Sequence, residues 1–172
     1  LLGYDFTLGK GRAGTPEVLA QLGKAEGFNV DRMDALSVHD EVVSSTRIRE
    51  LLHQGQVWEA SSLLGRLYSV QGEVIHGKNR GGRLLGFPTA NLAPTPTMLP
   101  KPGVYVTLAT PSESAGSGLP FVFDPAHPTP NTYPAVTNIG YNPTFGPGAL
   151  TVETHLLDFD ADLYGKHLEV AF

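Results

Sequence analysis

The sequence of 172 residues contains no cysteine. That absence excludes disulfides, thiolate nucleophiles and every zinc or iron–sulfur site that depends on cysteine. The sequence also has no apolar run near the roughly 18 residues that a membrane-spanning helix needs, and no basic region ahead of an apolar stretch at its start. We therefore expect neither a membrane span nor a signal peptide, and a cytoplasmic protein that is stabilised by packing or ligands.

Basic residues are scarce and unevenly distributed. The 12 Lys and Arg against 17 Asp and Glu give a formal net charge of −5. Residues 1–64 contribute −3, residues 65–101 contribute +4 and residues 102–172 contribute −6. Nucleic-acid-binding domains usually spread a basic face over a whole domain. The short basic stretch here is interrupted by glycine and suits a compact anion, so we expect no nucleic-acid partner.

Proline is nearly absent from the first half, since 13 of its 14 occurrences lie between Pro88 and Pro147. Because proline is poorly tolerated inside helices, the first third can be helical and the rest cannot. Apolar spacing, capping residues and glycine stops predict three helices, with a loop and a short strand at 28–38 between the first helix and the second. The predicted helices run from Pro16 to about Gly27, from Arg47 to His53, and from Val57 to Leu64.

After Gly65 the sequence pattern changes to alternation with a period of two. Short segments rich in β-branched and aromatic residues predict strands at 68–76, 103–110, 133–139, 150–157 and 167–172. Several such strands in about 100 residues favour a small antiparallel barrel. Residues 111–132 contain five prolines and are predicted to be a surface insertion, with a short strand at 121–123.

Two local motifs match known sites incompletely. Residues 9–14 fit the dinucleotide fingerprint G-x-G-x-x-G, with Asp31 or Asp34 where a ribose-binding acid is wanted. No complete βαβ unit surrounds them, which favours a turn into the Pro16 helix. Residues 158–169 imitate a calcium loop, but Leu163 occupies the position that requires glycine. An acidic turn is the better interpretation.

A glycine-rich stretch, residues 72–91, is the densest chemical signal. Its glycines let backbone N–H groups approach an anion, and three basic side chains add positive charge, as a phosphate-binding loop requires. Thr89 and Asn91 are two residues apart, so an extended backbone would point both to one side. Their oxygens suit magnesium, which usually has few protein ligands beside phosphate and water. A solvated glycine-rich hairpin is the alternative.

A carboxylate with catalytic potential lies in the strand predicted at 150–157. Alternation puts Glu153 and His155 on one face of that strand. A carboxylate there can accept the proton of an alcohol whose oxygen attacks phosphorus. The alternative is a surface strand with an exposed Glu–His face.

These motifs together resemble a known family. In order, residues 77–91, 103–105, 137–145, 152–159 and 162–165 follow the pattern of riboflavin kinases. The first third, on residues 3–14 and 44–49, resembles the later part of the FMN adenylyltransferase module of bacterial bifunctional FAD synthetases. The resemblance implies part of a Rossmann-like nucleotidyltransferase domain at 1–64, followed by an antiparallel β-barrel riboflavin kinase domain at 65–172.

The resemblance implies ATP- and magnesium-dependent phosphorylation of riboflavin to FMN by the barrel. Glu153 would be the catalytic base, Asn91 and Glu153 would contact the flavin, and Thr89 and Asn91 would bind Mg²⁺. The ATP-binding residues would be Gly77, Gly82, Arg83, Gly86, Pro88, Thr89 and Asn91.

For adenylylation of FMN to FAD, the resemblance implies ATP and FMN contacts from Asp5, Phe6, Ser44, Ser45, Thr46 and Arg49. Ser45 and Arg49 are four apart and would share a helix face at a helix N-terminus. The family's H-x-G-H phosphate motif and its C-terminal arginine-containing stretch and helix do not occur in this sequence. We therefore expect the adenylyltransferase activity to be lost, and flavin affinity to be weak, in this chain alone.

Two other functions remain open at this stage. A small barrel can be a flavin carrier that does no chemistry, because fold does not fix function. An oxidoreductase would use residues 9–14 for a nicotinamide dinucleotide. ADP release in the presence of magnesium separates the kinase from the carrier, and binding of a nicotinamide cofactor would indicate the oxidoreductase.

Overall fold

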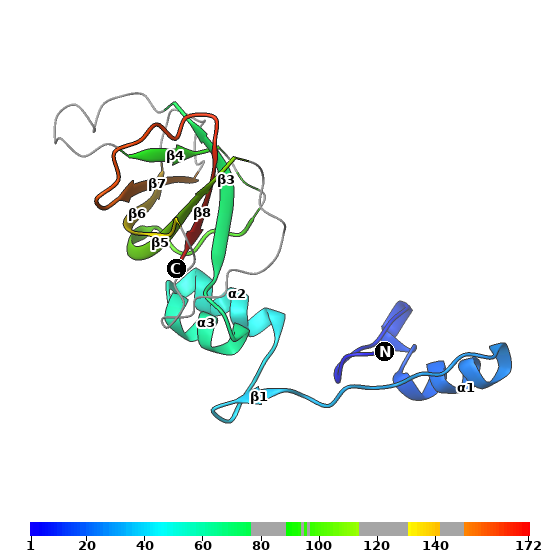
Figure 1. Ribbon diagram of the computed structural model, residues 1–172. Helices are drawn as coiled ribbons and strands as arrows, with labels where there is room; N and C mark the ends of the chain where they lie inside the picture. The colour runs from blue at the N-terminus through cyan, green and yellow to red at the C-terminus, as the bar shows by residue number, and fades with distance from the viewer. Residues whose placement is uncertain (77–88, 94, 96, 114–130, 142–149) are drawn as a thin grey trace. The chain divides into compact units, whose positions relative to one another are not determined.

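Two compact units make up the chain in a computed structural model, Leu1–Val43 and Ser44–Phe172 (Figure 1). The structure describes residues 1–76, 89–93, 95, 97–113, 131–141 and 150–172. The domain boundary predicted at residues 64 and 65 is a different division and stays a prediction.

The first unit contains the predicted first helix, α1 (Pro16–Glu26). The side chain of Thr15 caps its start by accepting a hydrogen bond from the Val18 N–H, and Pro16 occupies the first turn, where its missing N–H costs nothing. The helix ends at Gly27, which has a φ of +80° that glycine adopts without a steric penalty. The predicted helix is confirmed at both ends.

The glycine-rich segment before α1 is a tight loop. Leu8 and Gly14 exchange two backbone hydrogen bonds of 3.0 and 2.8 Å, and the short 3₁₀ turn η1 (Lys10–Arg12) lies between them. The predicted turn into the helix is thereby confirmed. Further along, β1 (Ser37–Val38) and β2 (Glu41–Val42) form the short antiparallel hairpin that ends the unit.

The second unit begins with two helices, α2 (Ser45–Gln54) and α3 (Val57–Leu64). The Ser44 hydroxyl accepts a hydrogen bond of 3.2 Å from the Arg47 N–H, so the cap is Ser44 and α2 begins two residues earlier than predicted. The helices pack at one end of the barrel (Figure 1). None of the helices in the described ranges is long and apolar enough to cross a membrane.

The remaining strands form a closed barrel in the order β3-β4-β7-β6-β5-β8, antiparallel throughout. The strands are β3 (Ser69–Ile75), β4 (Ala90–Leu92), β5 (Gly103–Ser112), β6 (Tyr133–Tyr141), β7 (Leu150–Leu156) and β8 (His167–Ala171). The antiparallel barrel and the five predicted strands are confirmed within one or two residues at each end. β4 was not predicted as a strand.

The predicted insertion at 111–132 begins later than expected. Pro111 and Ser112 continue β5 and pair with Leu168 and His167 of β8. A proline is tolerated there because it lies near the end of its strand. Residues 114–130, including the strand predicted at 121–123, lie outside the described residues.

A row of three threonines lies inside the barrel, among aliphatic side chains. The Thr107 and Thr137 hydroxyls are 2.8 Å apart, the Thr137 and Thr154 hydroxyls are 3.0 Å apart, and all three residues are at most 3% exposed. Thr107 also donates to the carbonyl of Ala135 at 3.3 Å. Each hydroxyl is thus satisfied by its neighbours, which removes the cost of burying it.

Because the hydroxyls satisfy one another, their removal should be non-additive. We expect Thr137→Val to destabilise the protein by about 1–3 kcal/mol, since it leaves two buried hydroxyls short of a partner. The triple variant with valine at 107, 137 and 154 should lose less free energy of unfolding than the sum of the losses in the three single variants. Urea denaturation of the variants measures both quantities, and equal, additive losses would contradict the hydrogen-bonded row.

Candidate active site

Strand pairing brings together two of the predicted site residues that are far apart in the sequence. In the ladder between β4 and β7, Asn91 is the register partner of Glu153, and Ala90 that of Thr154. Directly opposed residues in an antiparallel pair have Cβ atoms about 4.5–5.5 Å apart and share a face of the sheet. The Asn91 amide and the Glu153 carboxylate are therefore neighbours on one side of the barrel wall.

Burial shows which side this is. Ala90 and Leu92 of β4, like Val152 and Thr154 of β7, are buried, whereas Glu153 is partly exposed. The side chains of Glu153 and Asn91 thus lie on the outer face of the barrel. The alternation predicted for both segments is confirmed.

Thr89 directly precedes β4 and is exposed, and its place on the same side as Asn91 stays a prediction. The Asn91 side-chain amide nitrogen donates to the Thr89 backbone carbonyl at 3.4 Å, which orients the amide. A metal contact from Asn91 would then use its Oδ1. His155 also lies on this side, as the partner of Val136 in β6.

Asn138 of β6 is a member of the site that sequence reasoning missed. It is the register partner of Glu153 on the side away from Asn91, and its side chain is exposed. A Cβ at Gly140 would lie 3.5 Å from Asn138 Nδ2, so the amide lies over the bare backbone of that glycine. The row Asn91, Glu153, Asn138, which we call the outer row, places a carboxylate between two amides.

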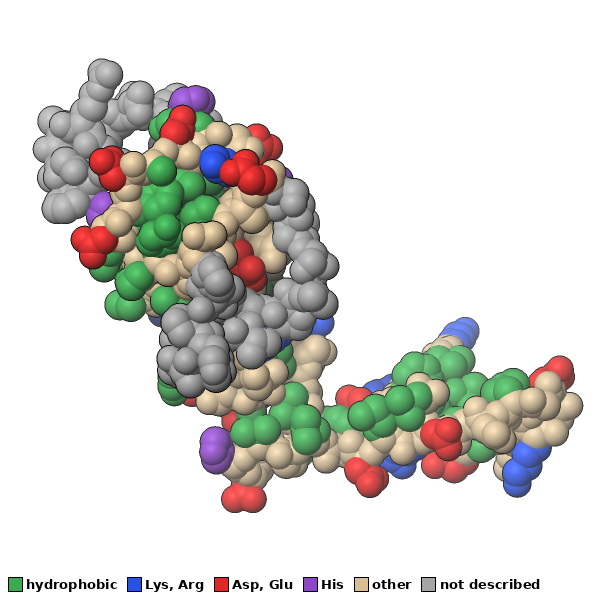
Figure 2. Space-filling view, in the orientation of Figure 1, with side chains coloured by type: hydrophobic (Ala, Val, Ile, Leu, Met, Phe, Trp, Pro, Cys, Tyr) green, Lys and Arg blue, Asp and Glu red, His purple; other side chains and the backbone are tan. Residues whose placement is uncertain are grey.

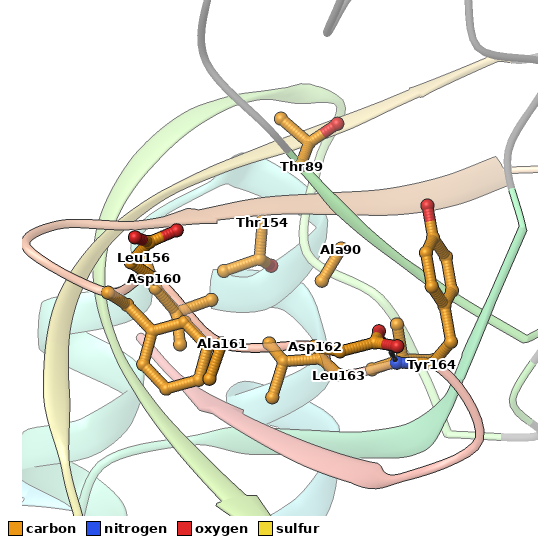
Figure 3. A pocket seen from close by; sticks show the side chains of 11 residues that line it. Thr89, Ala90, Thr154, Leu156, Asp160, Ala161, Asp162, Leu163 and Tyr164 are labelled. Carbon is orange, nitrogen blue, oxygen red and sulfur yellow. Dashed lines mark hydrogen bonds between the residues drawn. The ribbon is translucent and has the colours of Figure 1, made fainter.

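A pocket of about 240 Å³ opens beside β4 and β7 (Figure 3). Its lining consists of two strand segments and the loop before β8: Val74, Thr89, Ala90, Thr154, Leu156, Phe159, Asp160, Ala161, Asp162, Leu163 and Tyr164. Figure 3 shows Ala90 and Thr154 directed into the pocket and Thr89 at its edge. Thr89 therefore borders both the pocket and the outer row.

The pocket combines an apolar lining with carboxylates. Phe159 and Leu163 supply apolar surface, and Asp160 and Asp162 supply negative charge. Figure 2 shows hydrophobic side chains in a hollow of the barrel face with acidic side chains around it. Such a pocket can accept a flat, largely apolar ring.

Five predicted phosphate-loop residues fall outside the described part of the chain: Gly77, Gly82, Arg83, Gly86 and Pro88. Their roles stay predictions. No group of three or more His, Cys, Asp or Glu that could hold a metal occurs among the residues that the structure describes.

The residues predicted for a second nucleotide site lie in both units. Asp5 and Phe6 belong to the first unit, where Phe6 donates a backbone hydrogen bond to Gly3 in a turn. The others, Ser44, Ser45, Thr46 and Arg49, surround the N-terminus of α2 in the second unit. Arg49 Nη1 donates to Ser45 Oγ at 3.5 Å, so these two side chains share a face of α2 as predicted.

Comparison with family models divides the chain into two matches. A riboflavin kinase model matches residues 64–172, and an FAD synthetase model matches residues 1–47. The riboflavin kinase match covers all six barrel strands.

Curated relatives match both parts of the chain together. A bifunctional riboflavin kinase/FMN adenylyltransferase from Escherichia coli K12 is 34% identical over 169 residues, 98% of this chain and 49% of the relative. Proteins of that name from Listeria monocytogenes and Pseudomonas fluorescens are each 35% identical, over 98% and 99% of this chain and 48% and 50% of their own lengths. The chain thus spans about half the length of the curated relatives it matches.

A solved structure is similar to this chain. The crystal structure of a macrolide-efflux protein from Streptococcus pneumoniae superposes with a TM-score of 0.73 at 31% identity, over 98% of this chain and 49% of that one. The likeness covers both the barrel and the segment before it.

Proposed function

Because this chain belongs to the riboflavin kinase family, we propose that its barrel transfers the γ-phosphoryl group of ATP to the 5′-hydroxyl of riboflavin and so forms FMN. The observation that carries the proposal is the pairing of Asn91 with Glu153. That pairing joins the residue expected to bind nucleotide and metal to the expected base, at the edge of a pocket that suits a flat ring.

Glu153 is the proton acceptor in this reaction. Its carboxylate takes the proton of the 5′-hydroxyl while that oxygen forms a bond to the γ-phosphorus of ATP. The bond from the γ-phosphorus to the bridging oxygen breaks, ADP leaves, and Glu153 passes its proton to solvent. The partly exposed position of Glu153 suits this cycle, because the carboxylate stays solvated between turnovers.

The nucleotide and metal meet at Thr89. Thr89 and Asn91 offer hard oxygen atoms on one side of β4, as a magnesium site shared with phosphate and water requires. Bound there, Mg²⁺ would supply positive charge to the phosphate oxygens. With the ring of ATP in the pocket, the phosphates pass Thr89 and reach the outer row, where riboflavin presents its hydroxyl.

Replacement of the proposed base tests the function most directly. We expect Glu153→Gln to lower kcat for FMN formation by at least about 10², with KM for riboflavin little changed, because the amide cannot accept the proton. The assay measures FMN and ADP in the whole protein. Glu73→Gln, the same chemical change at an exposed position of β3, is the control.

Two results would go against the proposal. Unchanged turnover in Glu153→Gln would exclude its role as base. Flavin binding without ADP release in the unmodified protein would favour a carrier that does no chemistry.

Asn138 is proposed to orient the Glu153 carboxylate and the substrate hydroxyls. Asn138→Ala should lower kcat/KM for riboflavin about tenfold through the loss of a hydrogen bond to a charged or reacting group. Asn138→Asp should also move the acidic limb of the pH–rate profile to higher pH, because a second carboxylate opposite Glu153 disfavours its ionised form. An unmoved limb would show that the two side chains do not interact.

The matches to the first unit and to α2 support a second proposed activity, adenylylation of FMN to FAD by the whole protein. Ser45 lies at the N-terminus of α2, an end of a helix that attracts anions, and Arg49 adds a guanidinium beside it. Asp5, Phe6, Ser44 and Thr46 stay proposed contacts of ATP or FMN. We propose that residues 1–64 and 65–172 form the two modules. We also propose that the protein acts in the cytoplasm.

Replacement of Arg49 tests whether the two proposed activities use separate sites. Arg49→Ala in the whole protein should lower FAD formation at least about tenfold and leave FMN formation unchanged, since Arg49 lies on α2 and not in the outer row. Arg49→Lys should restore only part of the loss, because it keeps the charge without the planar fork. Equal losses of FMN and FAD formation would contradict separate sites.

A further inference from the structure

Tyr164 forms one wall of the pocket, and its ring stacks on the ring of His76, which is distant in the sequence. The ring centroids of Tyr164 and His76 lie 3.8 Å apart, with 26° between the ring planes. Tyr164 lies in the loop before β8, and His76 directly follows β3. Tyr164 also lines the pocket, where Figure 3 shows its ring standing at one end.

The backbone around Tyr164 is held firmly. The Tyr164 N–H donates to Asp162 Oδ1 at 2.9 Å. The next residue, Gly165, donates to the carbonyl of Val74 at 3.0 Å, and the Val74 N–H donates back to Lys166 at 2.8 Å. These bonds attach the loop to β3 two residues before His76.

The side chain of Tyr164 is less confined than its backbone. The residue is 45% exposed, so the ring has room to rotate about its side-chain torsions. Stacking on His76 holds the ring in one orientation before any ligand arrives. Ordering a side chain in advance removes a cost that binding would otherwise have to meet.

We propose that His76 is a positioning residue for the nucleotide, and that it holds the Tyr164 ring as a preformed wall against which the base of ATP stacks. The proposal rests on the proposed kinase function. His76 itself does not touch the base in this arrangement. Its contribution passes entirely through Tyr164.

A double-mutant cycle in the whole protein tests this dependence. We expect His76→Ala to raise KM for ATP about three- to tenfold, the range of one aromatic pair, with kcat within about twofold. His76→Phe should restore KM, because a phenyl ring can stack on Tyr164. In a Tyr164→Ala background, His76→Ala should have no further effect on KM.

The controls separate folding from positioning. Tyr164→Phe keeps the ring and should behave as the unmodified protein, and His53→Ala changes an exposed histidine of α2 that does not line the pocket. Thermal unfolding of every variant checks that the fold survives.

Three results would overturn the inference: additive effects of the His76 and Tyr164 changes, failure of His76→Phe to restore KM, or a loss confined to kcat. Each would mean that His76 acts directly on the phosphates or on the reaction. Absence of FMN formation in the unmodified protein would instead contradict the proposed function itself.

Discussion

The short pairing of β4 with β7 is the constraint on which the site depends. β4 has three residues, yet it links β3 to β7 and closes the barrel. A slip of one residue would turn Glu153 or Asn91 into the interior, because side chains alternate between the faces of a strand. Two features oppose such a slip: Ala90 and Leu92 are buried, and Thr154 is tied to Thr137 inside the barrel. The packing of the interior therefore fixes the chemistry of the outer face.

The two faces of the barrel wall at β4 and β7 carry different kinds of side chain. Its inner face carries aliphatic residues and the threonine row, which hold the strands together. Its outer face carries a carboxylate between two amides, in reach of solvent. Thr89 lies where the two sides meet, since it lines the pocket and its backbone carbonyl accepts a hydrogen bond from the Asn91 side chain. A substrate with a flat ring and a charged chain could therefore extend from one side to the other past this residue.

Local signals predicted the elements of the fold, and non-local pairing decided the site. Caps and glycine stops defined the helices because they act within one turn, and alternation defined five strands because each is long enough to show it. β4 was missed because a strand of three residues, which lies between Pro88 and Pro94, is too short to show an alternation of apolar and polar side chains. Asn138 was missed for a different reason: its segment, 137–145, resembles the family, but only the register with β7 places Asn138 opposite Glu153. The pocket likewise combines segments whose proximity no local pattern encodes.

The charged side chains that line the pocket favour one orientation of the proposed nucleotide. Asp160 and Asp162 make the part of the pocket near the loop before β8 negative, so a triphosphate is repelled from it and an uncharged base is not. Thr89 also lines the pocket, and it lies within the stretch 65–101 that carries the chain's excess of basic residues. A nucleotide bound with its base between Tyr164 and Phe159 and its phosphates toward Thr89 meets both conditions. The reversed orientation would place the phosphates against two carboxylates and the base beside the proposed metal ligands, so the acidic residues favour the orientation in which the γ-phosphate points toward the proposed base, Glu153.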